Sequence, residues 1–278
     1  MAAQIPQRDR RDHHLPKGYL NGFVHPSNGK LSVYDAECKR WSEKHPSQVG
    51  WVRGFYDYCP GSIPDQTADQ AFTSFENKFP NLRKELIDSK FSGWAKHLEF
   101  LLEYAQMLRA RTKLFRKQEV ASAQQRPLVR VKDVCNDPRT GLIVRVEELT
   151  ESKEQRETIW NNMAITTMRS EIQKGGAFFA TLHWCLRFTD PANPVITSDT
   201  PIIVREHSPI PTLQAAFERE RFQIFFPVCR HACLIGRPAK WDVETEIFDP
   251  LDLKDLQSSY FRGDSRFVYS PKRFAQFP

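Results

Sequence analysis

The sequence predicts a single α+β domain in which a mostly antiparallel sheet packs against long helices. Runs rich in β-branched and aromatic residues gather toward both ends of the chain, and helical patterns lie between them. This order argues against a doubly wound parallel sheet, in which strands and helices alternate regularly. The chain has 278 residues, of which 40% are hydrophobic and 27% charged, so it can bury a large core.

The first part of the chain predicts a flexible basic arm and then a β-hairpin. Residues 1–12 are polar and include several arginines, so we expect a frayed arm ahead of a domain that spans residues 13–278. Residues 19–35 contain strand-like runs and Asn28-Gly29, a dipeptide that favours a tight hairpin turn. We therefore expect an N-terminal β-hairpin.

The middle of the chain predicts three helices and a second hairpin. The first helix extends from about residue 65 to 86, and Pro80 should kink or divide it. The second helix, from about residue 91 to 115, carries one apolar stripe that we expect to pack on the sheet. Short strands within 128–146 predict the hairpin, and the helix after it should end at a glycine pair near residue 175.

Two apolar runs, 178–188 and 194–204, predict buried neighbouring strands. Three polar residues, Thr197, Ser198 and Asp199, interrupt the second run where a buried strand would stay apolar. Two interpretations are open. Ser198 and Asp199 either face a cleft from the end of a strand or form a side-chain-to-backbone turn before the next proline.

The last part of the chain predicts further elements of the same sheet and a helix. Apolar runs at 222–227 and 232–235 indicate two more buried strands. We also expect short helices at 212–220 and 251–260, and a closing strand at 266–270.

Charge and cysteine content limit the partners and the compartment. The net charge of +6 and the pI near 9.0 fit an anionic partner, such as RNA or single-stranded DNA, without requiring one. The six cysteines are scattered, the sequence opens with no signal peptide, and no apolar run is long enough to cross a membrane. We therefore expect a cytoplasmic protein with reduced thiols, no disulfide, no cofactor and no bound metal. The oligomeric state is not indicated.

Candidate site residues come from the N-terminal segment and from the end of the second helix. His13 either exchanges protons or contacts phosphate, or it hydrogen-bonds the backbone and anchors the N-terminal segment. Arg109, Arg111 and Arg116 bind an anion, form ion pairs with Glu76, Glu99 or Glu103, or are simply solvated. The motif Cys229-Arg-His231-Ala-Cys233 has no second Cys/His pair at zinc spacing, and no phosphate-binding, dinucleotide-binding, hydrolase or zinc-protease signature is present.

Four separated motifs occur in a fixed order along the chain. They are His13-x-Leu15-Pro16-x-x-Tyr19-Leu20-x-x-Phe23, Gln106-x-x-Arg109-x-Arg111-Thr112, Thr197-Ser198-Asp199-x-Pro201 and Phe267-Val-Tyr-Ser270. Together they resemble the domain of unknown function 4238 family over essentially the full chain. The chain differs in having Lys113 where a proline commonly follows the Arg-Thr pair, and His14 where an aromatic residue is more usual. The resemblance implies no particular reaction, because the family is defined by sequence.

Two functional hypotheses follow. The first is a metal-independent, nuclease-like enzyme that acts on a phosphodiester or another anionic substrate. The second is a non-catalytic module that binds nucleic acid or an acidic protein and can serve regulation. The enzyme requires His13, Arg111 and Asp199 to converge on one solvent-open pocket. The residues assigned to the enzyme are His13, Asp199 and Ser198 for catalysis, and Arg109, Arg111 and Arg116 for substrate binding.

Overall fold

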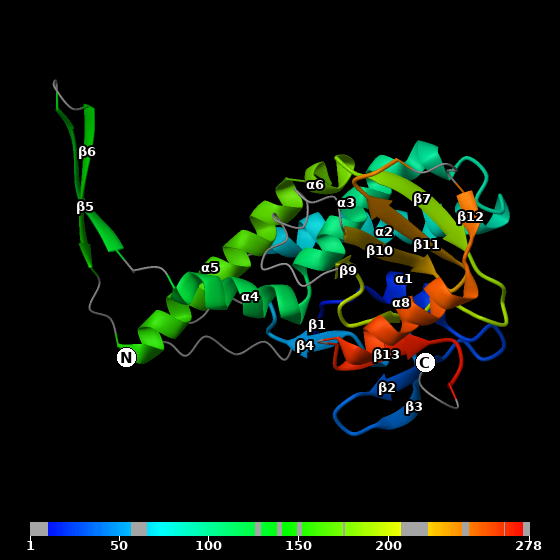
Figure 1. Cartoon of the computed structure of the whole chain (residues 1–278). Coiled ribbons are helices and arrows are strands. Elements are labelled where there is room, and N and C mark those ends of the chain that lie inside the picture. Colours follow the sequence, from blue (N-terminus) through cyan, green and yellow to red (C-terminus); the bar gives the residue numbers. More distant parts are fainter. Residues whose placement is uncertain are drawn as a thin grey trace.

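Two mostly antiparallel sheets and a set of helices confirm the predicted α+β class in a computed structural model of the chain (Figure 1). The structure describes residues 11–56, 66–125, 129–137, 141–148, 152–174, 176–206, 222–240, 245–263 and 265–274.

The larger sheet has five strands in the order β12-β7-β11-β10-β9. All neighbours are antiparallel except β12 and β7, which run parallel. The prediction that the two central runs form neighbouring strands is therefore wrong, because β11 and β10 lie between β7 and β9. Both intervening strands are almost wholly apolar, and such strands take central positions in a covered sheet. The strands are β7 (His183–Phe188), β9 (Ile203–Glu206), β10 (Phe222–Cys229), β11 (Ala232–Arg237) and β12 (Thr245–Ile247).

The smaller sheet has four strands in the order β3-β2-β13-β8. An N-terminal hairpin is confirmed, but β2 and β3 form it, and Asn28-Gly29 lies ahead of β2 rather than between the two strands. The predicted position over residues 19–35 is therefore wrong, and residues 19–23 form no strand. They belong to a short helix, α1 (Lys17–Leu20), and to a 3-10 turn, η1 (Asn21–Phe23), which follow Pro16 at the helix N-cap. The strands of this sheet are β2 (Leu31–Asp35), β3 (Arg40–Lys44), β8 (Thr197–Ser198) and β13 (Phe267–Ser270).

A separate two-stranded ribbon pairs β1 (Arg11–His13) with β4 (Trp51–Arg53) in antiparallel register. The strand β1 begins inside the segment predicted as the arm, because Arg11 and Asp12 pair with Arg53 and Val52. Residues 1–10 of the predicted arm lie outside the described residues.

The predicted helix over 91–115 is two helices. The helix α3 (Leu98–Ala110) follows a 3-10 turn, η3 (Trp94–His97), and α4 (Lys113–Gln124) begins after Thr112. The Thr112 side chain accepts a hydrogen bond from the Phe115 amide, so it caps a new helix. Helical periodicity alone did not reveal this break. In contrast, Pro80 lies inside α2 (Gln66–Asp88) without dividing it.

The remaining helices follow their predicted signals with one exception. The helix α5 (Lys153–Gln173) starts at a capping box formed by Ser152, and α8 (Pro250–Arg262) is capped by Asp249. The exception is α6 (Ala177–Ala180), which occupies the start of a predicted strand. The second hairpin, β5 (Val129–Asp137) with β6 (Gly141–Glu148), is confirmed and projects away from the body (Figure 1). The predicted helix at 212–220 lies outside the described residues.

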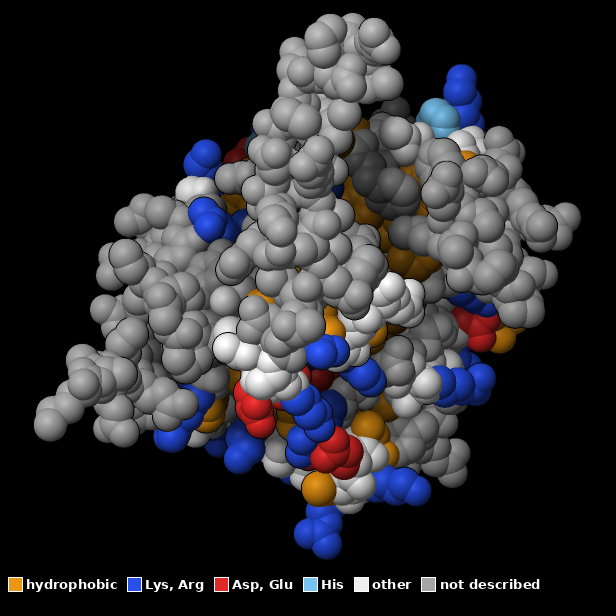
Figure 2. Space-filling model, turned by 90° about the vertical axis from the view of Figure 1, so that its left-hand side faces the viewer, with side chains coloured by type: hydrophobic (Ala, Val, Ile, Leu, Met, Phe, Trp, Pro, Cys, Tyr) orange, Lys and Arg blue, Asp and Glu red, His pale blue; other side chains and the backbone are white. Residues whose placement is uncertain are grey.

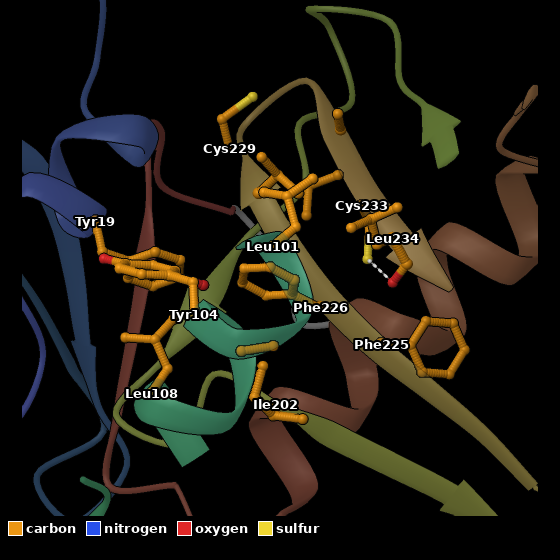
Figure 3. Close-up of a cluster of buried hydrophobic side chains, with 14 of the residues drawn as sticks. Tyr19, Leu101, Tyr104, Leu108, Ile202, Phe225, Phe226, Cys229, Cys233 and Leu234 are labelled. Carbon is orange, nitrogen blue, oxygen red and sulfur yellow. Dashed lines mark hydrogen bonds between the residues drawn. The ribbon is translucent and has the colours of Figure 1, made fainter. Parts of the chain in front are cut away.

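The core lies between α3 and the five-stranded sheet (Figure 3). Leu101, Tyr104 and Leu108 of α3 are fully buried, and Leu101 faces Phe226 of β10. Tyr19 is also fully buried in this core, and its hydroxyl donates a hydrogen bond to the Pro227 carbonyl of β10 at 3.0 Å. The predicted packing of this helix on the sheet is thus confirmed.

Within the described parts of the chain, no helix is both long and apolar enough to cross a membrane. Among the described cysteines, Cys38, Cys229 and Cys233 are free thiols. Burial raises the pKa of Cys229 and Cys233, so these thiols stay protonated and are poor metal ligands. No group of three possible metal ligands occurs among the described residues.

Replacing Leu101 by Ala should lower the free energy of unfolding by about 2 to 5 kcal/mol, because it leaves a cavity under the sheet. Leu251→Ala is a matched control, since that side chain is 75% exposed and its loss should change little. Urea unfolding of the two variants measures both values. Equal stability of the Leu101→Ala variant and the parent would contradict the packing.

Candidate functional site

Arg111 is a buried cation at the corner between α3 and α4. Its guanidinium donates to the Tyr56 hydroxyl at 2.7 Å, to the main-chain carbonyl of His13 and to the Glu76 carboxylate, with which it forms an ion pair. The side chain is only 3% exposed, and its guanidinium also lies 4.2 Å above the ring of Phe72. These partners use the donors of the guanidinium, so Arg111 holds the structure together and has little capacity left for a substrate.

Arg109 and Arg116 are also engaged, although less completely. Arg116 donates to the Phe55 carbonyl at 2.6 Å and lies over the Phe55 ring. Arg109 lies 3.6 Å from the Glu171 carboxylate and over the Phe115 ring. Both side chains are partly exposed at the surface.

The main chain of His13, rather than its imidazole, anchors the N-terminal segment. The His13 carbonyl accepts hydrogen bonds from Arg111 and from the Tyr56 hydroxyl, the latter at 3.2 Å. The imidazole is half-buried, and its Nε2 atom has no partner among the described residues. Burial lowers the pKa of His13, so the imidazole is neutral near pH 7.

One face of the β1–β4 ribbon gathers basic and aromatic residues. Directly opposite residues of an antiparallel pair share a face, and so do alternate residues of each strand. The register pairs Arg11 with Arg53 and His13 with Trp51, so these four residues lie on the same face. We call them the ribbon face. Asp12 is on the other face, where it is buried and accepts a hydrogen bond from the Tyr56 amide at 3.2 Å.

Arg11 and Trp51 are in direct contact within the ribbon face. The Arg11 guanidinium lies 4.5 Å from the centre of the Trp51 ring, a cation–π arrangement. The Trp51 indole nitrogen donates to the Gln48 carbonyl at 3.1 Å, which fixes the orientation of the ring. Arg11 and Arg53 are both exposed.

His14 is buried behind the ribbon. Neither of its ring nitrogens has a partner among the described residues, and its ring packs 5.9 Å from that of Phe55. Burial, together with the positive charge of Lys113, lowers the pKa of His14 to about 3. This imidazole is therefore neutral at physiological pH.

Ser198 and Asp199 stand where β8 meets β13. The Ser198 hydroxyl is fully buried, accepts from the Thr200 amide at 3.0 Å and contacts the Ser265 hydroxyl at 2.7 Å. Asp199 Oδ1 accepts from the Phe267 amide at 3.3 Å. These contacts match the turn interpretation. Burial raises the pKa of Asp199 to about 6, although the Phe267 amide and the charge of Lys113 oppose this shift.

Sequence reasoning missed Lys113 as a site residue. It is exposed, it is the first residue of α4, and its charge acts on both His14 and Asp199. The signal was available, because Lys113 differs from the proline that commonly follows the Arg-Thr pair.

No contact between His13 and Asp199 is present among the described residues. Besides burial, the largest effects on the pKa of His13 include those of Glu76 and Arg111, and the largest on the pKa of Asp199 include that of Lys113. The proposed acid–base pair of His13 and Asp199 therefore stays a prediction. Two hollows are described in the structure, and neither is lined by these residues.

The sequence matches the family described as "Protein of unknown function (DUF4238)" over residues 11–255, so the chain belongs to this family. Comparison with curated proteins finds no match, and comparison with solved structures finds none either.

Replacing Arg111 by Met should lower the free energy of unfolding by about 3 kcal/mol or more, because it leaves Glu76, Tyr56 and the His13 carbonyl without their shared donor. Arg111→Lys should also destabilise the folded protein, since the lysine ammonium cannot reproduce the planar, forked set of N–H donors of a guanidinium. Lys96→Met is the control, because Lys96 and Glu85 form an exposed pair worth at most about 1 kcal/mol. If Arg111→Met and Lys96→Met lower the free energy of unfolding by similar amounts, Arg111 does not have this structural role.

Asp199 should make the protein less stable as the pH rises. Its pKa is about 6 in the folded chain, against an ordinary value of 3.8, so the folded state binds more protons between these values. The contribution of Asp199 to unfolding free energy should therefore fall from about pH 4 to about pH 6 and stay constant above. Asp199→Asn should remove this slope. Urea unfolding across that range tests it, and a parent-minus-variant difference that does not change with pH would refute it.

Proposed function

We propose that this member of the DUF4238 family binds single-stranded nucleic acid, RNA or DNA, on the ribbon face. The observation that supports the proposal is the register of the ribbon, which places Arg11 directly opposite Arg53 and puts Trp51 and His13 beside them. Of the two hypotheses, binding is favoured because Arg111, the cation that the enzyme required, is committed to internal partners.

The register places the guanidinium-bearing residues Arg11 and Arg53 directly opposite each other. A phosphate suits such a pair, because each guanidinium can donate two parallel hydrogen bonds to phosphate oxygens. Arg11 and Arg53 are exposed at the end of a ribbon whose other end is held by Arg111. The ribbon face is therefore a rigid support for a phosphate.

Trp51 adds a surface that suits a nucleobase. Aromatic side chains beside a basic groove bind single strands, because bases stack on them whatever their sequence. The ring of Trp51 is half-exposed, its orientation is fixed by Gln48, and a guanidinium already lies over it. This combination favours a single strand over a duplex, whose bases are stacked on each other.

Basic residues of α4 extend the surface. Lys113 and Lys117 are exposed, and Arg116 joins α4 to the residue just after the ribbon through the Phe55 carbonyl. Figure 2 shows the side of the molecule on which α4 and the ribbon lie in Figure 1, and Lys and Arg side chains gather in its lower part with a few acidic ones among them. We infer that the strand runs from the ribbon face toward α4.

The nuclease-like enzyme is the second candidate, and one observation favours it. Burial shifts the pKa of His13 down and that of Asp199 up to about 6, and opposite shifts of this kind mark a base and an acid. In such a reaction His13 accepts the proton of the attacking hydroxyl as its oxygen bonds phosphorus. The bond from phosphorus to the leaving oxygen then breaks, and protonated Asp199 donates a proton to that oxygen. Lys113 offsets the negative charge.

Binding should depend on salt and on the ribbon arginines. A fluorescently labelled oligothymidylate of about 16 nucleotides and an RNA of the same length serve as probes. Arg11→Ala and Arg53→Ala should each weaken binding and lower the slope of log K against log salt concentration by about 1, because each removes one phosphate contact. Arg40→Ala is the matched control, since Arg40 is an exposed arginine on β3, away from the ribbon.

Three outcomes decide between the candidates. Equal affinity of the parent and both ribbon variants would contradict the proposal, and so would equally tight binding of poly-L-glutamate. Cleavage of the RNA in the presence of chelator, lost in His13→Ala and falling as the pH rises through about 6, would favour the enzyme instead.

A further inference from the structure

A hollow of about 620 Å³ opens beside the edge strand β12, on a different part of the chain from the ribbon face. Its floor is apolar and comes from Phe248, Leu253 and Phe274. Its rim is polar and includes Asp190 and Lys254. A volume of this size lies within the range of ligand sites, and the lining combines an apolar floor with polar groups at the rim.

The strand β12 offers main-chain groups next to the hollow. It is the outer strand of the five-stranded sheet, and among the described residues it pairs with β7 on one side and with no strand on the other. The Phe248 amide donates to the Phe188 carbonyl at 2.8 Å, so it points toward β7. Because successive residues of a strand alternate, the amide and carbonyl of Ile247 point toward the free edge. An extended segment can pair with them.

Large apolar side chains are exposed around the same edge. Ile247 is 76% exposed and Leu251 is 75% exposed, whereas the other exposed large hydrophobic residues in the described chain reach at most 40%. Ile247 lines the hollow, and Leu251 lies in the first turn of α8, between the lining residues Pro250 and Leu253. Two such residues beside one hollow form an apolar rim that a partner can cover.

Lys254 of α8 places a positive charge at the hollow, and the nearby carboxylates are engaged with other groups. Asp252 pairs with Arg187 at 2.7 Å and Asp255 pairs with Arg205 at 2.8 Å, so both carboxylates are engaged. The Asp190 carboxylate accepts from the Ala192 amide within its own turn. Lys254 is exposed, and no ion pair to it is present among the described residues. An acidic group on a ligand would complement it.

We propose that this edge binds an extended peptide segment of a partner protein. The segment adds a strand beside β12 by hydrogen bonding to Ile247, places one apolar side chain on the floor formed by Phe248 and Leu253, and directs an acidic residue to Lys254. The edge strand binds a peptide backbone in the extended conformation, and the hollow binds an apolar side chain. The Lys254 ammonium favours a peptide with an acidic residue at the matching position.

A phage-displayed library of random twelve-residue peptides, selected on the full chain, tests the proposal. The expected peptides carry an acidic residue close to an apolar one. In fluorescence polarisation, Ile247→Pro should weaken their binding about tenfold or more, because proline removes the amide on the free edge and keeps the bond between Phe248 and Phe188. Lys254→Glu should have a similar effect. Arg262→Glu is the control, since it changes an exposed cation on α8 that does not line the hollow.

Other outcomes overturn the proposal. Selection that enriches no peptide would show that β12 does not bind peptides. Peptides that bind Ile247→Pro and Lys254→Glu as tightly as they bind the parent and the Arg262→Glu control would show the same. Dimerisation in sedimentation velocity that Ile247→Pro abolishes would assign the edge to a second copy of the chain. Peptide binding that appears only after deletion of residues 275–278 would assign the hollow to the chain's own end.

Discussion

The buried guanidinium of Arg111 is the interaction on which the arrangement of the N-terminal half depends. It connects the end of α3 to three segments that are distant in sequence, through the His13 carbonyl, the Tyr56 hydroxyl and the Glu76 carboxylate. Tyr56 stays a neutral phenol, because burial raises its pKa to about 12, so it can accept from Arg111 and donate to His13. A buried cation is stable only with such partners. The ribbon is held against the helices by this set of bonds.

This anchoring divides the ribbon into two faces with different roles. The inner face carries Asp12, which is buried, and the outer face carries Arg11, His13, Trp51 and Arg53. Because the main chain of His13 anchors the ribbon, its imidazole remains without a hydrogen bond at Nε2 among the described residues. The His13 carbonyl thus contributes to stability, while the four side chains of the ribbon face lie on the side of the ribbon opposite Asp12.

Local patterns predicted most of the fold, whereas long-range pairing was not predictable from them. The Ser152 cap and the runs that became β10 and β11 are local signals, and the structure follows them. The break after Ala110 was missed because the apolar stripe continues through it, although Thr112 is a good helix cap. The order of β7 and β9 in the sheet depends on strands that come later in the sequence, so neighbouring runs were wrongly paired.

The candidate site shows the same limit. An ion pair of Arg111 with Glu76 was one of the predicted alternatives and is confirmed, but the pair links two helices, so the sequence pattern could not favour Glu76 over Glu99 or Glu103. The ribbon face was missed, because its register joins residues that are 42 positions apart, Arg11 and Arg53. A photocrosslinking experiment with RNA that contains 4-thiouridine tests the central claim most directly. Mass spectrometry should find the crosslinks on peptides that contain Trp51 or His13, and crosslinks confined to other parts of the chain would contradict the account.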